Sequence, residues 1–176
     1  MTVWNMDWEH EVGLVWEALK DYFEIAVTAT HIHILPLVAL CNTQTLSNLA
    51  KAIIFFDPVF KDNFPVKNKQ DKHAAGNTDA PKVAQIIQSD NSKPHISIFK
   101  EIDAILEGGP DLDRLINYLS PTCRFAWSFN NISTGGNIEY RQPPGSQNPE
   151  DAIKHIKFTK LFVEKVINWD EGNIPS

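Results

Sequence analysis

The chain has 176 residues, of which 43% are hydrophobic and 22% are charged, as in an ordinary globular protein. A chain of this length can bury enough surface to fold without a disulfide or a structural metal. Sixteen Lys and Arg residues against 22 Asp and Glu residues give a net charge of −6, which argues against nucleic acid or an anionic membrane as a partner. We expect a single domain over residues 1–176.

Amphipathic spacing predicts two helices in the first third of the chain. Residues 7–27 repeat apolar side chains every three or four positions, and Asp7 is suited to cap the first turn. Residues 45–56 show the same spacing, and Asp57-Pro58 predicts a stop. Between these helices, residues 25–40 allow two interpretations. Their β-branched residues favour a strand, whereas their apolar length favours a buried helix interrupted near Pro36.

The middle of the chain combines a polar segment with three short helices. Residues 61–79 are rich in Lys, Asn and Asp and are predicted to form a mobile loop. The following apolar periodicity predicts helices over 81–88, behind an Asp79 cap, over 94–107 and over 110–119.

The pattern then changes to the two-residue alternation of a β-strand. Cys123, Phe125, Trp127 and Phe129 are separated by smaller or polar residues, and a second alternation follows at 138–141. These strands predict a β-hairpin over 123–142 that places Trp127 opposite Tyr140. A last helix is predicted over 149–169. The expected fold is therefore mainly α (α+β), a compact domain of about five to six helices with one β-hairpin.

The cysteines and the uncharged centre of the chain bear on the compartment. Cys41 and Cys123 each lie beside apolar residues, which predicts two buried, reduced thiols. Residues 1–11 contain three acidic and no Lys or Arg residues, unlike a signal peptide, and the uncharged stretch 25–50 is too polar to cross a membrane. We expect a cytoplasmic protein with no membrane partner.

His31 and His33 are the first candidates for chemistry. On a strand, residues i and i+2 point to the same face, so the two imidazoles could act as a base or grip one ion. On a helix they would lie about 200° apart. A metal ion would need a third ligand, and the nearby sequence supplies no Asp or Glu for this role. We therefore assign no metal site and identify no cofactor. His31 and His33 are kept as candidate catalytic residues.

The hairpin supplies candidate binding residues. Arg124 and Arg141 are predicted on one face, where they could contact an anion. Trp127 and Tyr140 are predicted on the other face, which would pack toward the core, and they complete the set of candidate binding residues.

Two functions remain open at this point. Strong amphipathic periodicity and an acidic first helix favour a soluble, non-enzymatic protein-interaction or regulatory module, with another protein as its partner. The alternative is a small enzyme or ligand-binding protein with a small-molecule partner. Its site would lie between the uncharged 25–50 segment and the aromatic hairpin, with His31 and His33 as base or metal ligands. The sequence leaves open whether the protein is an enzyme.

Overall fold

A computed structural model describes residues 7–20, 29–35, 42–63, 74–90, 92–134 and 136–167. Within these ranges it contains six α-helices, one 3₁₀ turn and three short strands. In chain order these are α1 (Trp8–Leu19), β1 (Ile32–Ile34), α2 (Thr43–Asn63), η3 (Asn77–Asp79), α3 (Pro81–Ser89), α4 (Pro94–Leu106), α5 (Leu112–Leu119), β2 (Trp127–Ser128), β3 (Ile138–Tyr140) and α6 (Pro149–Ile167). The mainly α fold with a hairpin is confirmed.

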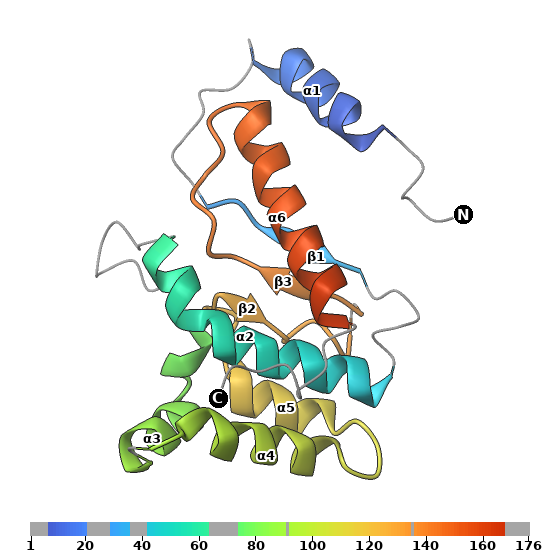
Figure 1. Cartoon of the computed structure of the whole chain (residues 1–176). Helices are drawn as coiled ribbons and strands as arrows, with labels where there is room; N and C mark the ends of the chain where they lie inside the picture. Colours follow the sequence, from blue (N-terminus) through green and yellow to red (C-terminus); the bar gives the residue numbers. More distant parts are fainter. Residues whose placement is uncertain are drawn as a thin grey trace.

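The strands form a small antiparallel sheet in the order β1-β3-β2 (Figure 1). Trp127 pairs with Tyr140, so the predicted hairpin register is confirmed. The edge strand β1 comes from the ambiguous segment, and Ile32 pairs with Tyr140 across more than a hundred residues of chain. The strand interpretation is therefore confirmed for Ile32–Ile34, while residues 21–28 and 36–41 lie outside the described part.

One face of the sheet is covered by α2 and α6, which pack against each other (Figure 1). The contact is aromatic. Trp127 and Tyr140 stack with ring centroids 4.3 Å apart, and Phe60 of α2 and Phe162 of α6 each approach Trp127. Burying side chains of this size contributes on the order of 2 kcal/mol each, so this cluster is the main source of stability at the sheet.

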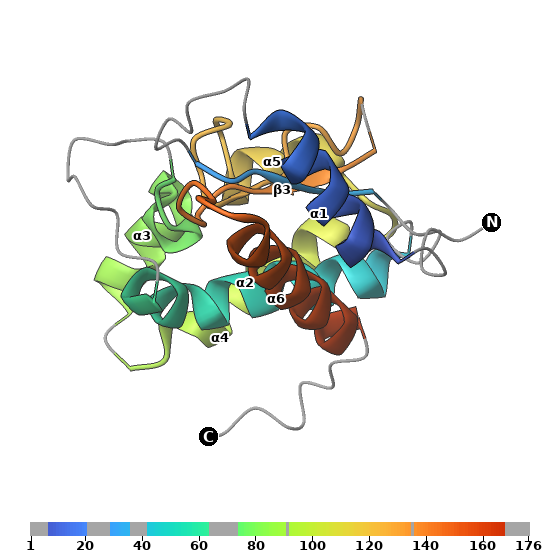
Figure 2. The same ribbon diagram turned by 90° about the horizontal axis from the view of Figure 1, so that it is seen from above.

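The remaining helices flank this core. On one side, α3, α4 and α5 pack against one another, and α4 also contacts α2, where the almost fully buried Lys51 pairs with Asp103. On the other side, α1 lies across α6 (Figure 2), where Lys157 pairs with Glu9 at 2.7 Å. None of the residues of α1 is buried, although Asp7 caps this helix as predicted, accepting from the His10 backbone N–H.

The predicted stop at Asp57-Pro58 is wrong, because α2 continues to Asn63 with Pro58 inside it. A proline in a helix removes one backbone hydrogen bond and costs about 3 kcal/mol. The helical turn that contains Pro58 places Phe60 in the aromatic core, where it is 4% exposed. Asp57 is fully buried, and its carboxylate accepts a hydrogen bond from the Asn77 backbone N–H. These tertiary contacts offset the local cost.

The predicted mobile loop at 61–79 differs from the structure at both ends. Residues 61–63 belong to α2, and Ala75 pairs with Phe125 in an isolated bridge. Asn77 is fully buried in η3. Asp79 does not cap α3, since its carboxylate accepts from the Gly76 backbone N–H instead. Residues 64–73 lie outside the described part.

Two other sequence expectations can be compared with the structure. Cys123 is exposed, so the expectation that it is a buried thiol is wrong; it precedes β2 rather than lying in the sheet. Cys41 lies outside the described part. Among the described helices, none is long and apolar enough to cross a membrane.

Candidate functional site

The pairing of β1 with β3 brings two pairs of polar side chains onto the same face of the sheet, His31 with His33 and Glu139 with Arg141. His33 lies directly opposite Glu139, and Ile32 and Ile34 alternate with the histidines toward the covered face. His31 immediately precedes β1 and Arg141 immediately follows β3. Because both pairs are spaced i and i+2, all four polar side chains project from the face opposite the aromatic core.

Glu139 connects the histidines to the arginine. Its Oε1 atom lies 2.9 Å from Nδ1 of His31 and 3.6 Å from Nε2 of His33. Its other oxygen, Oε2, accepts a hydrogen bond of 2.9 Å from Nη1 of Arg141. The second ring nitrogen of His33 lies 3.1 Å from Oδ1 of Asn137. We call His31, His33, Glu139 and Arg141 the sheet-face cluster.

The members of the sheet-face cluster differ in exposure. The side chain of Glu139 is only 6% exposed, whereas those of His31 and His33 are 36% and 50% exposed. Burial and the nearby Arg141 charge lower the pKa of His31, against the opposing effect of Glu139. His31 is therefore mainly a neutral imidazole near pH 7, next to a guanidinium that stays charged.

Arg141 has unused hydrogen-bonding capacity. Its Nε atom is buried and has no hydrogen-bond partner among the described residues. A guanidinium carries five N–H donors, of which the contact with Glu139 uses one. The cluster thus combines a neutral base, a fixed carboxylate and a cation that can take an anion.

The sheet-face cluster also contains residue types that can bind a metal ion. In the described ranges, no three or more His, Cys, Asp or Glu side chains are arranged to hold a metal ion. In the sheet-face cluster, the imidazole and carboxylate atoms are hydrogen-bonded to one another and to Asn137. The geometry favours a base over a metal ligand for the two histidines.

The structure separates the other predicted site residues from this cluster. Trp127 and Tyr140 are fully buried on the opposite face of the sheet, where they form the core. Arg124 is exposed and lies before β2, where its backbone carbonyl accepts from Ala75. Of the predicted binding residues, only Arg141 joins the two histidines.

Sequence reasoning missed Glu139 and Asn137 as members of the site. In the alternating stretch 138–141, Glu139 shares a face with Arg141, but no role was predicted for it. The available signal was the repeated spacing, because a Glu-x-Arg strand and a His-x-His strand each direct two polar side chains to one face. What the sequence could not show is that these strands are neighbours.

A buried polar network fixes the strand next to the site. The Asn77 side chain binds β2 from both sides, accepting from the Trp127 N–H at 3.0 Å and donating to the Trp127 carbonyl at 2.8 Å. The Asn77 backbone N–H donates in turn to Asp57 of α2 at 2.9 Å. Through these contacts α2 holds β2, and β2 holds β3, which carries Glu139.

Comparison with known proteins identifies a family. A family model described as "Putative amidoligase enzyme" matches residues 5–163, and the searches of curated proteins and of solved structures found no match. The family match contradicts our prediction of a non-enzymatic interaction or regulatory module, and it supports the alternative of a small enzyme. Because the matched region covers most of the chain and contains the whole sheet-face cluster, the chain belongs to this amidoligase family.

Proposed function

We propose that the protein joins a carboxylate to an amine through an amide bond, and that the sheet-face cluster is its active site. The observation that carries this proposal is the hydrogen-bonded series His31–Glu139–Arg141, which lies inside the region that matches the amidoligase family. The site would use a small carboxylate and a small amine as substrates, which are the small-molecule partners of the enzyme alternative.

The chemistry sets three requirements for such a site. A carboxylate is a poor electrophile, so a ligase first transfers a phosphoryl group from a nucleoside triphosphate to a carboxylate oxygen. The amine nitrogen then attacks the acyl carbon, the bond from this carbon to the phosphate oxygen breaks, and phosphate leaves. The amine also loses a proton. The protein must therefore bind anions, orient the two substrates and accept this proton.

Arg141 and His31 meet two of these requirements. Arg141 has guanidinium donors beyond the Nη1 bond to Glu139, and a planar guanidinium suits a carboxylate or a phosphoryl group. His31 has a lowered pKa and is accessible to solvent, so its neutral ring can take the proton that the attacking amine loses. Glu139 contacts both side chains and holds them in position.

A nucleotide-dependent ligase also needs a compartment that supplies nucleoside triphosphates. This requirement supports the predicted cytoplasmic location, which we retain as part of the proposal.

The proposal can be tested with hydroxylamine as a general amine. Purified protein is incubated with ATP, Mg²⁺, hydroxylamine and a panel of carboxylic acids, and the hydroxamate product is measured with Fe(III). We expect ATP-dependent hydroxamate from at least one acid. His31→Gln should lower the rate by roughly 10²-fold or more, in the range typical for loss of a general base. Arg141→Gln should mainly raise the KM for the acid.

The matched control is His10→Gln, because His10 is an exposed histidine on α1 outside the cluster. This variant should keep the wild-type rate. Full activity in both the His31 and the Arg141 variants would exclude the sheet-face cluster as the active site. Absence of product from every acid with folded protein would contradict the ligase proposal itself.

A further inference from the structure

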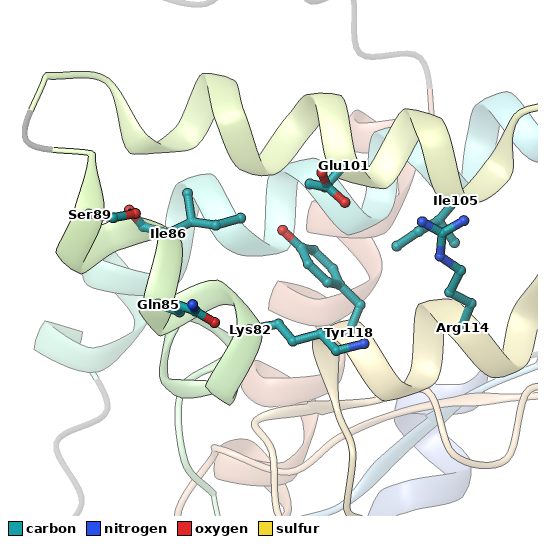
Figure 3. Close-up of a pocket in the computed structure, with 8 residues that line it drawn as sticks. All are labelled: Lys82, Gln85, Ile86, Ser89, Glu101, Ile105, Arg114 and Tyr118. Atoms are coloured by element: carbon teal, nitrogen blue, oxygen red, sulfur yellow. The ribbon is translucent and has the colours of Figure 1, made fainter.

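A second candidate site lies between α3, α4 and α5, away from the sheet. A pocket of about 320 Å³ opens there, at the small end of the size range of ligand sites. It shares no residue with the sheet-face cluster. It is lined by Lys82, Gln85, Ile86, Ser89, Glu101, Ile105, Arg114 and Tyr118 (Figure 3).

Three charged side chains of this pocket come from three different helices. Lys82 lies on α3, Glu101 on α4 and Arg114 on α5. All three are exposed, and none forms an ion pair or side-chain hydrogen bond with any described residue. Here two cations and one anion surround the same opening unpaired.

The floor of the pocket contains a polar atom without a partner. Tyr118 is 4% exposed, and its buried hydroxyl has no hydrogen-bond partner among the described residues. Figure 3 shows its ring in the middle of the lining residues, with the hydroxyl on the side of Glu101. Burial and the Glu101 charge raise the pKa of this phenol, so it remains protonated and can donate. A buried, unpaired hydroxyl costs about 1–3 kcal/mol, which a ligand atom bound to it would recover.

We propose that this pocket binds a small zwitterion of the free α-amino-acid type. The ligand carboxylate contacts Arg114 and Lys82, its ammonium contacts Glu101, and the Tyr118 hydroxyl donates to the carboxylate. Arg is the residue best suited to a carboxylate, because its donors match both oxygens. The apolar side chains of Ile86 and Ile105 would face the ligand's own side chain.

The charge pattern distinguishes a zwitterion from simpler ligands. A plain anion such as phosphate would meet Lys82 and Arg114 but would be repelled by Glu101. A plain amine would meet Glu101 but would be repelled by the two cations. Only a ligand with both charges satisfies all three side chains, so it should bind more tightly than either of its halves.

The test is a titration of the ¹⁵N-labelled protein followed by amide NMR shifts. The probes are glycine, L-valine, L-glutamine, acetate, methylammonium and inorganic phosphate at constant ionic strength. We expect at least one amino acid to shift amides of α3, α4 and α5 with a Kd at least about tenfold below those of acetate and methylammonium, a difference of about 1.4 kcal/mol. Phosphate binding as tightly as the best amino acid would overturn the zwitterion assignment. Absence of shifts at about 50 mM, above the millimolar range of weak binding, would overturn the site.

Variants separate binding from folding. Lys82→Met should raise the Kd of the amino acid severalfold, whereas Lys165→Met, an exposed lysine on α6, should not. Tyr118→Phe should raise the Kd and leave the melting temperature of the free protein equal or higher, because it removes an unpaired buried hydroxyl. A clear fall in that melting temperature would show that the hydroxyl is already paired and would contradict the argument. His31→Gln should leave this binding unchanged, so the pocket and the proposed active site can fail independently.

Discussion

Replacing Asp57 with Ala should remove a large fraction of the free energy of unfolding. Asp57 is fully buried in α2, and its carboxylate accepts from the backbone N–H groups of Asn77 at 2.9 Å and Thr78 at 3.2 Å. It also accepts from the Thr78 hydroxyl and lies 3.1 Å from Nζ of Lys61. Asp57→Ala would remove the acceptor of both backbone N–H groups and of the Thr78 hydroxyl, whereas Lys61 would keep its contacts with Thr78 and Asp79.

The expected cost follows from these contacts. A hydrogen bond to a charged group contributes about 1.5–3 kcal/mol, and breaking a buried charge pair costs about 3–5 kcal/mol. These values do not add, because Thr78 is half-buried and Lys61 is about one-third exposed, so water recovers part of the loss. We expect a loss of about 3–5 kcal/mol, against a typical domain stability of about 5–15 kcal/mol.

Urea unfolding followed by circular dichroism measures this loss directly. The matched control is Asp62→Ala, because Asp62 is an exposed aspartate five residues further along α2. The control should change the free energy of unfolding by no more than about 0.5 kcal/mol. If Asp57→Ala cost less than about 1 kcal/mol with an unchanged m-value, the interpretation of this network as a structural anchor would be refuted.

Two further predictions concern backbone space and titration. Gly76→Ala should destabilise the protein by about 1–3 kcal/mol, because a Cβ would lie 2.5 Å from Oδ2 of the fully buried Asp57 as well as 2.0 Å from Cε of Lys61. Gly13→Ala on α1, where a Cβ would have nothing within 4 Å, should stabilise the protein by about 0.5–1 kcal/mol, and thermal unfolding of both variants measures the two effects. The His31 imidazole should titrate below 6.5 in NMR, and Arg141→Gln should raise that midpoint. Because His31 binds a proton more readily in the unfolded chain than in the folded one, the contribution of the neutral His31 to stability is lost as the pH falls below about 6.5. If Arg141→Gln left the titration midpoint of His31 unchanged, the effect of the Arg141 charge on His31 would be contradicted.

Local sequence patterns were sufficient to predict the elements that are specified by neighbouring residues. The helices predicted over 94–107 and 110–119 appear as α4 and α5 within about two residues at each end, since apolar spacing and flanking Gly-Gly specify them without distant contacts. Both linking glycines, Gly108 and Gly109, have positive φ. The Trp127–Tyr140 pairing was also predictable, because the register must place the apolar residues of both alternating strands on the same buried face.

The failures occur where distant contacts override a local signal. Pro58 normally ends a helix, but Phe60 and Asp57 make contacts with β2, β3 and η3 that no local pattern displays. The composition around Asn77 is typical of a loop, yet this residue is fully buried because it binds both backbone groups of Trp127. Sequence spacing could place the two histidines on one face, but not next to Glu139, which is 106 residues from His33.

The active-site proposal and the core network are physically connected. Every link from α2 through Asp57, Asn77 and β2 to β3 is a buried hydrogen bond or a strand pair, so the position of Glu139 depends on contacts far from the exposed histidines. The aromatic core on the opposite face holds the same strand, because Tyr140 follows Glu139 directly and stacks on Trp127. In the described part of the chain the sheet is only three strands wide, yet it holds a buried carboxylate between an imidazole and a guanidinium, because its rigidity comes from the helices beneath it.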